Sequence, residues 1–258
     1  GPMVEVEKEI LRKVASLIDY PKTFGGTFPT GGSMCNFMAL IIARDKKIPE
    51  IKNDGKSQNL VCYSSENSHY SIKKNASFAG IGRNNVRYIK TNKKGEMCSE
   101  DLQSSIKNDL KNGLIPFFVN ATVGTTVMGA IDPISEIANI CNKNNIWFHI
   151  DGAFSGTVIF SKKYKHLVEG IQNSDSFCFN AHKTLGTPLS TSILLIKDEK
   201  DLYKSFSNKA DYLYQTDNDN YNLGQTSFEC GRRNNALKFW TLWKYVGTNG
   251  IAQMVEQN

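Results

Sequence analysis

Hydrophobic positions along the chain follow two patterns: short apolar runs, and segments whose apolar residues lie three or four positions apart. The first pattern is typical of buried strands, and the second predicts helices that bury one face. The apolar runs predict strands at residues 60–63, 86–89, 117–120, 147–151, 176–180 and 191–196. The helical spacing predicts helices at residues 4–18, 36–44, 69–78, 100–111, 134–142 and 237–245.

Short strands that alternate with helices predict an α/β fold with a largely parallel sheet covered by helices on both faces. The 258 residues fit one large domain or two small ones. Ser99, followed by acidic residues, is the expected N-cap of helix 100–111. Residues 24–33, rich in Gly, Pro and Thr, are expected to form a turn, and residues 216–223 a loop.

Charge and cysteine content narrow the class of protein. The net charge is +6, but the basic residues form scattered pairs, which are typical of a solvated surface and not of nucleic-acid binding. No apolar run approaches the ~20 residues of a membrane span, and no signal peptide is visible. The six cysteines lack metal-site or disulfide spacing, so we expect a cytoplasmic protein without a metal.

Two predicted strands end in groups that can carry chemistry. Strand 176–180 leads into Asn180, Ala181, His182 and Lys183, and strand 147–151 ends in Asp151. Active sites of α/β sheets form at such strand ends. A lysine there can form a Schiff base with an aldehyde, and an aspartate can hold a protonated ring nitrogen, which together suggest pyridoxal phosphate. Taken singly, the lysine could be solvated and the aspartate could cap a helix.

Three further features fit the same ligand. Gly32 and Ser33 precede a helix, where glycine and free backbone amides suit a phosphate, although an ordinary glycine turn reads the same way. His69 could stack on a flat ring or simply lie on the surface. Thr122, at the end of strand 117–120, could bond ligand oxygens or belong to a tight loop. These features and the two strand-end groups follow one another at successive strand ends, and this order favours a single binding site.

Longer runs resemble the group II pyridoxal phosphate-dependent amino acid decarboxylases, which include glutamate, cysteine sulfinate, aspartate and aromatic amino acid decarboxylases. The matching text covers about residues 23–247 and includes TGGSMCNFMALIIAR, SSENSHYSIKKNASFAGIG, PFFVNATVGTTVMGAIDPISEIA, WFHIDGAFSG, FNAHKTLG and CGRRNNALKFWTLWK. The runs SHYSIKK, NATVGTTVMGAIDPI and ECGRR are most similar to the acidic branch. The resemblance implies the type I fold of pyridoxal phosphate enzymes, with a mostly parallel seven-stranded sheet.

The resemblance also implies roles for individual residues. Lys183 would be the catalytic lysine that holds the cofactor, Asp151 would pair with its ring nitrogen, and Ala153 would pack on the ring. His69 would stack on the opposite face as a further catalytic residue. Thr122 would contact the ring oxygen or the substrate carboxylate. The phosphate would be surrounded by Gly32, Ser33, Asn180 and His182.

Two residues are assigned to the substrate by the same resemblance. Arg232 would bind its carboxylate, and Tyr221, in a loop, would return a proton to the α-carbon. Arg233 stands where glutamate decarboxylases have histidine, which favours a wider acidic specificity. Ala181 replaces the usual proline, a change expected to soften that turn.

The family is about twice as long as this chain, so an N-terminal segment and a C-terminal small domain are expected to be largely absent. The implied division is a lead-in helix at residues 1–22, a cofactor-binding domain at 23–247, and the start of a connection at 248–258.

The implied function is decarboxylation of an acidic L-amino acid by a homodimer without nucleic-acid or membrane partners. A pyridoxal phosphate-binding domain without turnover and another lyase or aminotransferase of the same fold remain alternatives. A nucleotide-binding domain is disfavoured because the glycine turn lacks a Walker lysine.

Overall fold

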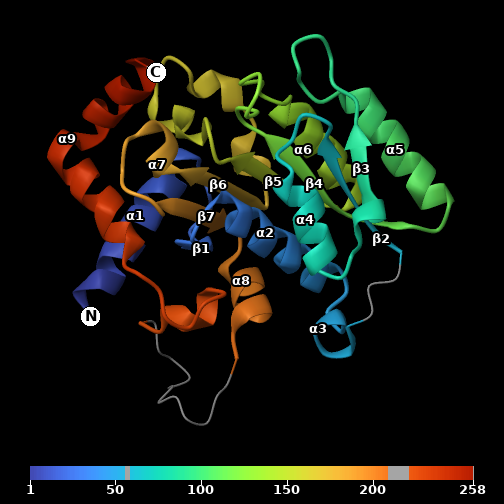
Figure 1. The fold of residues 1–258 in the computed structure, drawn as a ribbon, viewed down its shortest axis with the longest axis horizontal. Coiled ribbons are helices and arrows are strands. Elements are labelled where there is room, and N and C mark those ends of the chain that lie inside the picture. The colour runs from blue at the N-terminus through green and yellow to red at the C-terminus, as the bar shows by residue number, and fades with distance from the viewer. Residues whose placement is uncertain (56–58, 209–220, 258) are drawn as a thin grey trace.

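The computed structural model describes residues 1–55, 59–208 and 221–257, and its centre is one twisted sheet (Figure 1). The strands are β1 (Gly25–Thr27), β2 (Leu60–Ser65), β3 (Val86–Ile89), β4 (Ile115–Thr122), β5 (Trp147–Gly152), β6 (Ser176–Asn180) and β7 (Ser192–Ile196). They are ordered β1-β7-β6-β5-β4-β2-β3. Only β7 runs antiparallel to its neighbours, β1 and β6, among the described strands. The predicted mostly parallel seven-stranded sheet is confirmed.

Helices cover both faces of this sheet. The α-helices are α1 (Pro2–Leu17), α2 (Gly32–Lys47), α3 (Ile51–Asp54), α4 (Ser71–Phe78), α5 (Ser99–Lys111), α6 (Ile134–Asn144), α7 (Ala181–Thr184), α8 (Glu199–Phe206) and α9 (Asn235–Gln257). Short 3₁₀ segments are η1 (Arg83–Asn85), η2 (Gly156–Phe160), η3 (Lys165–Val168), η4 (Ile171–Asn173) and η5 (Leu223–Thr226). Buried residues of α2, α4 and α8 pack on one face, and those of α1, α5, α6 and α9 on the other.

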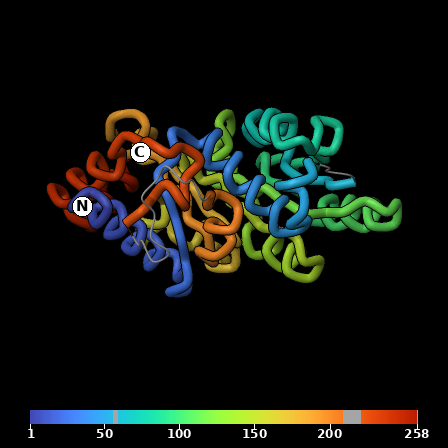
Figure 2. Tube along the Cα trace, turned by 90° about the horizontal axis from the view of Figure 1, so that it is seen from below, coloured from blue at the N-terminus to red at the C-terminus, as the bar shows by residue number. Residues whose placement is uncertain are grey.

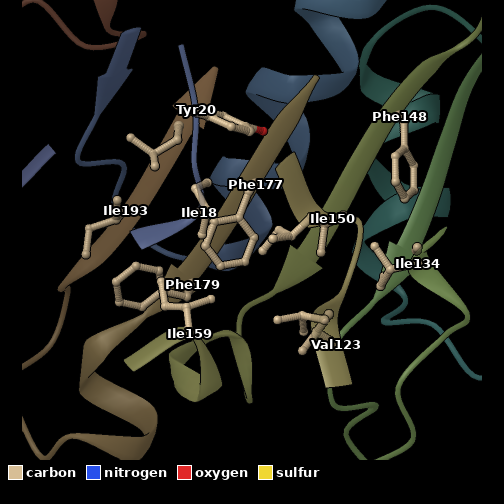
Figure 3. Close-up of a cluster of buried hydrophobic side chains, with 14 of the residues drawn as sticks. Ile18, Tyr20, Val123, Ile134, Phe148, Ile150, Ile159, Phe177, Phe179 and Ile193 are labelled. Atoms are coloured by element: carbon tan, nitrogen blue, oxygen red, sulfur yellow. The ribbon is translucent and has the colours of Figure 1, made fainter. Parts of the chain in front are cut away.

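The two-sided cover explains why the strands are continuous apolar runs and not alternating ones. Successive side chains of a strand point to opposite faces. In β6, Phe177 and Phe179 therefore join the core under α1 and α9, while Cys178 joins the core under α2. Figure 3 shows the first of these cores, in which Phe177 and Phe179 lie beside Ile150 of β5 and Ile159. Both faces must be apolar because neither meets water.

The edge strand β1 lies inside the segment expected to form only a turn. Its three residues pair with β7 in antiparallel register. A Cβ on Gly26 would lie 2.8 Å from the Leu194 carbonyl oxygen and 2.9 Å from Leu11, so glycine allows the strand to approach β7 closely. The glycine content that suggested a turn is therefore a packing requirement of a short strand.

The N-cap of α5 and the presence of α8 differ from expectation. Ser99 is the first residue of α5 and not its N-cap; Cys98 occupies that position, and its side chain does not cap the helix. The Ser99 hydroxyl donates instead to Glu136 of α6, at 2.5 Å, so the N-cap prediction was wrong because a tertiary partner was available. Helix α8 was not predicted; the Asp198 side chain caps it by accepting from the Lys200 amide at 3.0 Å.

The first and last helices lie side by side at one end of the molecule (Figure 2). Ile10 and Val14 of α1 share a core with Phe239 and Trp243 of α9. Helix α9 is kinked at Gly247, where φ is 71°. Within the described residues, no helix is both long and apolar enough to span a membrane.

A histidine is buried inside the sheet. His149 of β5 is fully buried, and its ring stacks on Phe118 at 5.7 Å between centroids. Its nitrogens contact the Ser176 hydroxyl at 2.8 Å and the Asn36 amide oxygen at 3.0 Å. Burial lowers the pKa of His149 to about 4 because the charged ring would lose its hydration.

We expect His149 to make the protein less stable in acid. Its pKa is lower in the folded than in the unfolded state, so between about pH 6.5 and 4 the unfolded chain binds the extra proton. The apparent free energy of unfolding should fall on acidification, by at most about 1.4 kcal/mol per pH unit from this group. Urea titrations of the wild type and His149→Gln across this window measure the contribution as the difference between their slopes. Equal slopes would show that His149 does not titrate this way.

A second prediction concerns the aromatic core that joins α9 to the sheet. Phe239 is fully buried and contacts Phe160 and Phe179 edge to face at 6.1 and 6.0 Å. Phe239→Ala should lower the free energy of unfolding by roughly 3–5 kcal/mol, through lost burial and a cavity. The control is Tyr245→Ala on the same helix, where the ring is 89% exposed and the change should stay within about 0.5 kcal/mol. Chemical denaturation followed by circular dichroism measures both.

Candidate active site

A cavity of about 180 Å³ lies where the carboxyl ends of β4, β5 and β6 meet the start of α2. Its lining includes all nine residues expected to contact a cofactor: Gly32, Ser33, His69, Thr122, Asp151, Ala153, Asn180, His182 and Lys183. It also includes four residues that the sequence reasoning missed: Asn36, Gly124, Thr126 and Phe154. The fold thus brings together residues that are up to 151 positions apart, the separation of Gly32 and Lys183.

Asp151 supplies a buried carboxylate at the end of β5. The residue is 3% exposed. One carboxylate oxygen accepts from the Asn36 amide at 2.7 Å, and the other accepts from the Ala153 backbone N–H at 3.0 Å. A buried carboxylate needs such donors because it has lost water. These bonds fix its plane against the cavity, where it can face a cationic group.

The N-terminus of α2 forms the opposite wall. The cap residue Gly31 offers no side chain, so the first amides of this 16-residue helix have no side-chain acceptor. A Cβ on Gly32 would lie 2.9 Å from the Ala153 Cβ and 3.1 Å from the Asn180 amide nitrogen. Glycine therefore keeps the backbone close to the lining, and the free amides and helix dipole suit a phosphate.

Lys183 is carried by the short helix α7, which follows β6 directly. The Ala181 N–H donates to the Thr191 carbonyl at 2.9 Å, and the Thr191 N–H donates to His182 Nδ1 at 3.0 Å. Proline at position 181 could not make the first bond. The turn is thus tied to the chain just before β7 by a bond that the usual proline would not allow. Lys183 itself remains exposed beside the cavity.

His69 reaches the cavity from the loop before α4. Its Nδ1 lies 2.8 Å from the Ser71 hydroxyl and 3.2 Å from the Ser71 backbone nitrogen, whose N–H donates to it. Burial is the main cause that lowers the pKa of His69, and nearby Lys183 lowers it further, while Asp151 acts in the opposite direction. The ring is therefore neutral at physiological pH and can lie against an aromatic ligand.

Two buried oxygen atoms in the lining, Thr122 Oγ1 and Asn180 Oδ1, have no hydrogen-bond partner among the described residues. Leaving such a group unpaired costs about 1–3 kcal/mol. Asp132 meanwhile holds the end of β4 by accepting from the Thr122 N–H at 2.7 Å, and burial raises its pKa to about 6. The rigid, unsatisfied oxygens fit a polar ligand, so the lining suits a flat phosphorylated aldehyde.

Arg232 lies outside this lining. Its guanidinium forms an ion pair with Glu7 of α1, with Nη2 at 2.8 Å and Nη1 at 3.3 Å from the two carboxylate oxygens. Nη1 also lies 3.4 Å from the Phe28 carbonyl. The side chains of the pair are 9% and 5% exposed, so this is a buried ion pair. The described structure therefore places the expected substrate arginine against α1 and outside the cavity lining.

Tyr221 also lies outside the cavity. It is 54% exposed, its ring lies 5.0 Å from the Lys8 amine, and a hydrogen bond with Glu5 is the main cause that raises its pKa. Most of the expected loop, residues 216–220, lies outside the described residues.

The spacing of Asn36 is the signal that the sequence offered for it, and this signal shows only its helix face. Asn36 follows Gly32 by four positions, one helical turn, and so lies on the same face of α2 as the helix start. Nothing in the sequence indicated that this face would meet Asp151, which is 115 positions away. Gly124 and Thr126 belong to the run that included Thr122, but no role was assigned to them.

Comparisons with known proteins identify relatives of the whole chain. The profile of the pyridoxal-dependent decarboxylase conserved domain matches residues 2–258. Acidic amino acid decarboxylase GADL1 of Homo sapiens is 41% identical over 258 residues, which cover 98% of this chain and 49% of that protein. Cysteine sulfinic acid decarboxylase of Rattus norvegicus is 38% identical over 260 residues, covering 98% and 52%. The chain spans about half the length of the curated relatives it matches.

Solved structures show the same fold. The crystal structure of mouse CSAD in apo form superposes with a TM-score of 0.93 at 37% identity, covering 99% of this chain and 54% of that one. Oryza sativa TDC with PLP and tryptamine gives 0.90 at 26% identity, covering 97% and 54%. The profile match over almost the whole chain, together with this fold, shows that the chain belongs to the pyridoxal-dependent decarboxylase family.

Proposed function

We propose that the cavity binds pyridoxal 5′-phosphate and that the protein decarboxylates an acidic L-amino acid. The observation that carries the proposal is the convergence of Lys183, Asp151 and His69 on one cavity beside the open start of α2. These groups supply an amine, a carboxylate and a flat neutral ring. Few other ligands call for this combination next to a phosphate site.

Different residues around the cavity would bind different parts of the cofactor. The first amides of α2, with Ser33, Asn180 and His182, would hold the phosphate. Asp151 would keep the ring nitrogen protonated, and Ala153 and His69 would lie against the two faces of the ring. Thr122 would give its unpaired hydroxyl to a ligand oxygen. Lys183 would attach the cofactor covalently and release it to the substrate amine.

The bound cofactor would supply an electron sink for the charge left when CO₂ departs. Asp151 would support that sink because its fixed negative charge favours a protonated ring nitrogen. Exclusion of water from the reacting carboxylate once the cavity is filled would favour loss of its charge as CO₂. Tyr221 is proposed as the proton donor to the α-carbon, a role that stays a prediction.

The acidic substrate class is proposed from the names of the relatives, acidic amino acid decarboxylase and cysteine sulfinic acid decarboxylase. Arg232 is proposed to bind a substrate carboxylate. Its contact with the carboxylate of Glu7 shows the bond geometry that such binding uses. Arg233, an exposed neighbour, adds positive charge to the same segment.

We further propose a cytoplasmic homodimer. Apolar side chains lie exposed in or near the cavity wall, among them Val127 at 93%, Met128 at 54% and Phe154 at 44%. Such a patch marks an interaction surface, and a second copy would cover it. All six cysteines, each within the described residues, are free thiols, which fits a reducing compartment.

The chemical role of Lys183 can be tested directly. Purified protein should take up pyridoxal phosphate and turn yellow, and borohydride reduction should leave the cofactor attached to the Lys183 peptide in a mass spectrum. Lys183→Ala should lose this attachment and release CO₂ roughly 10²-fold more slowly or worse. Lys162→Ala, at an exposed position, is the matched control and should behave as the wild type.

The substrate panel for the same assay is aspartate, glutamate, cysteine sulfinate and an aromatic amino acid. CO₂ release from one or more acidic substrates supports the proposed activity. Cofactor binding without CO₂ from any of the four would instead favour a binding domain without turnover. A Lys183→Ala protein that decarboxylates at the normal rate would overturn the role of Lys183.

A further inference from the structure

A line of buried hydrogen bonds runs behind the cavity, across the face of the sheet that α2 covers. The Trp147 indole nitrogen donates to the Ser176 hydroxyl at 2.8 Å. The same hydroxyl lies 2.8 Å from His149 Nδ1, and His149 Nε2 lies 3.0 Å from the Asn36 amide oxygen. The Asn36 amide nitrogen then donates to Asp151 at 2.7 Å. We call Trp147, Ser176, His149 and Asn36 the relay chain.

The line of bonds begins at the Trp147 indole and ends at the Asp151 carboxylate, and both groups have fixed polarity. An indole N–H can only donate, and an ionised carboxylate can only accept. Asn36 must therefore present its NH₂ group to Asp151 and its oxygen to His149. That oxygen can only accept, so His149 must carry its proton on Nε2 and leave Nδ1 bare. Ser176 completes the chain by accepting from the indole and donating to Nδ1.

A branch of the relay chain reaches His69. The Asn36 amide nitrogen also donates to the Ser71 hydroxyl at 3.1 Å. Ser71 then has its own proton to give, and its nearest partner is His69 Nδ1 at 2.8 Å. The Ser71 backbone N–H points to the same nitrogen at 3.2 Å. His69 Nδ1 is therefore an acceptor, and a neutral His69 carries its proton on Nε2.

From this geometry we infer that Asn36 is a positioning residue that sets two groups of the site at once. Through one bond it orients the Asp151 carboxylate, and through Ser71 it helps fix the tautomer of His69. The Trp147–Ser176–His149 segment holds the Asn36 amide in the required orientation from behind. The inference rests on the proposed cofactor site for its functional part, but its proton positions do not depend on any ligand.

Burial makes the alternative orientation of the Asn36 amide energetically unfavourable. Asn36 is 1% exposed, and Ser176 and His149 are fully buried. Rotating the Asn36 amide would turn its oxygen toward the carboxylate of Asp151 and its NH₂ toward the N–H of His149. Each mismatched contact would leave a buried polar group unpaired. Cys178 adds a weak thiol contact to the same Asn36 oxygen at 3.6 Å, which favours the same orientation.

The first part of the test uses the ligand-free chain with ¹⁵N-labelled histidine. Two-bond ¹H–¹⁵N correlation spectra distinguish the two neutral tautomers, and the sequence has only four histidines. At about pH 8, His69 and His149 should show a protonated Nε2 and a bare Nδ1. His166 is an internal reference for the other tautomer. Its Nδ1 lies 2.9 Å from the Lys163 carbonyl and must carry the proton. A protonated Nδ1 on His69 or His149 would overturn the inferred direction.

The second part compares two buried asparagines. Asn36→Ala removes the donor to Asp151 and the acceptor of His149. It should weaken pyridoxal phosphate binding about tenfold or more and populate both tautomers of His149. Asn120→Ala is the matched control, since Asn120 is fully buried and donates to the Ser64 hydroxyl at 3.0 Å but lies outside the relay chain. It should change neither quantity by more than about twofold.

The third part separates the branch from the main chain. Ser71→Ala removes the hydroxyl between Asn36 and His69, so the ¹⁵N signals of His69 should shift while those of His149 stay unchanged. An Asn36→Ala protein with wild-type affinity and wild-type His149 signals would overturn the positioning role. Failure of the wild type to bind pyridoxal phosphate would count against the proposed function and would leave the tautomer test intact.

Discussion

The hydrogen bond between Asn36 and Asp151 is the contact on which the site depends. A carboxylate at the end of a central strand has to be paired when it is buried, and Asp151 is 3% exposed. Its partner comes from α2, so pairing Asp151 also fixes how α2 crosses the sheet. That placement brings the start of α2, with Gly32 and Ser33, over the ends of β5 and β6. One buried bond thus links the wall that suits a phosphate to the carboxylate that suits a ring nitrogen.

Most of the fold could be predicted because burial on both faces leaves a strong signal. Strands β3 and β6 match the predicted ranges, and β4, β5 and β7 differ by a few residues at their ends. The predictions that failed concern features that tertiary contacts determine. Strand β1 is made of glycine and threonine, and only its pairing with β7 makes it a strand. Ser99 had a better partner in Glu136 than in its own helix.

The residues of the candidate site also divide into those that the sequence could place and those that depend on tertiary contacts. Residues at strand ends could be placed because the carboxyl ends of parallel strands meet at one edge of a sheet. Arg232 and Tyr221 follow the last strand, where no such rule applies, and in the described structure both contact α1. Asn36 was missed because its importance comes from partners on β5 and in the segment before α4, which helical spacing alone cannot reveal.

The buried ion pair between Glu7 and Arg232 shows that α1 contributes more than apolar packing. Separating two buried charges leaves each one unpaired, which costs several kcal/mol, whereas the intact pair adds little net stability. Such a pair therefore acts mainly to specify which groups meet. The Trp240 indole of α9 likewise donates to a carboxylate of α1, that of Glu9, at 2.8 Å. Helix α1 is thus matched to the segment from Arg232 to α9 by charge as well as by the shared apolar core. Any movement of Arg232 toward a substrate carboxylate would leave Glu7 buried without its partner, so binding that carboxylate would have to offset the cost of breaking the pair.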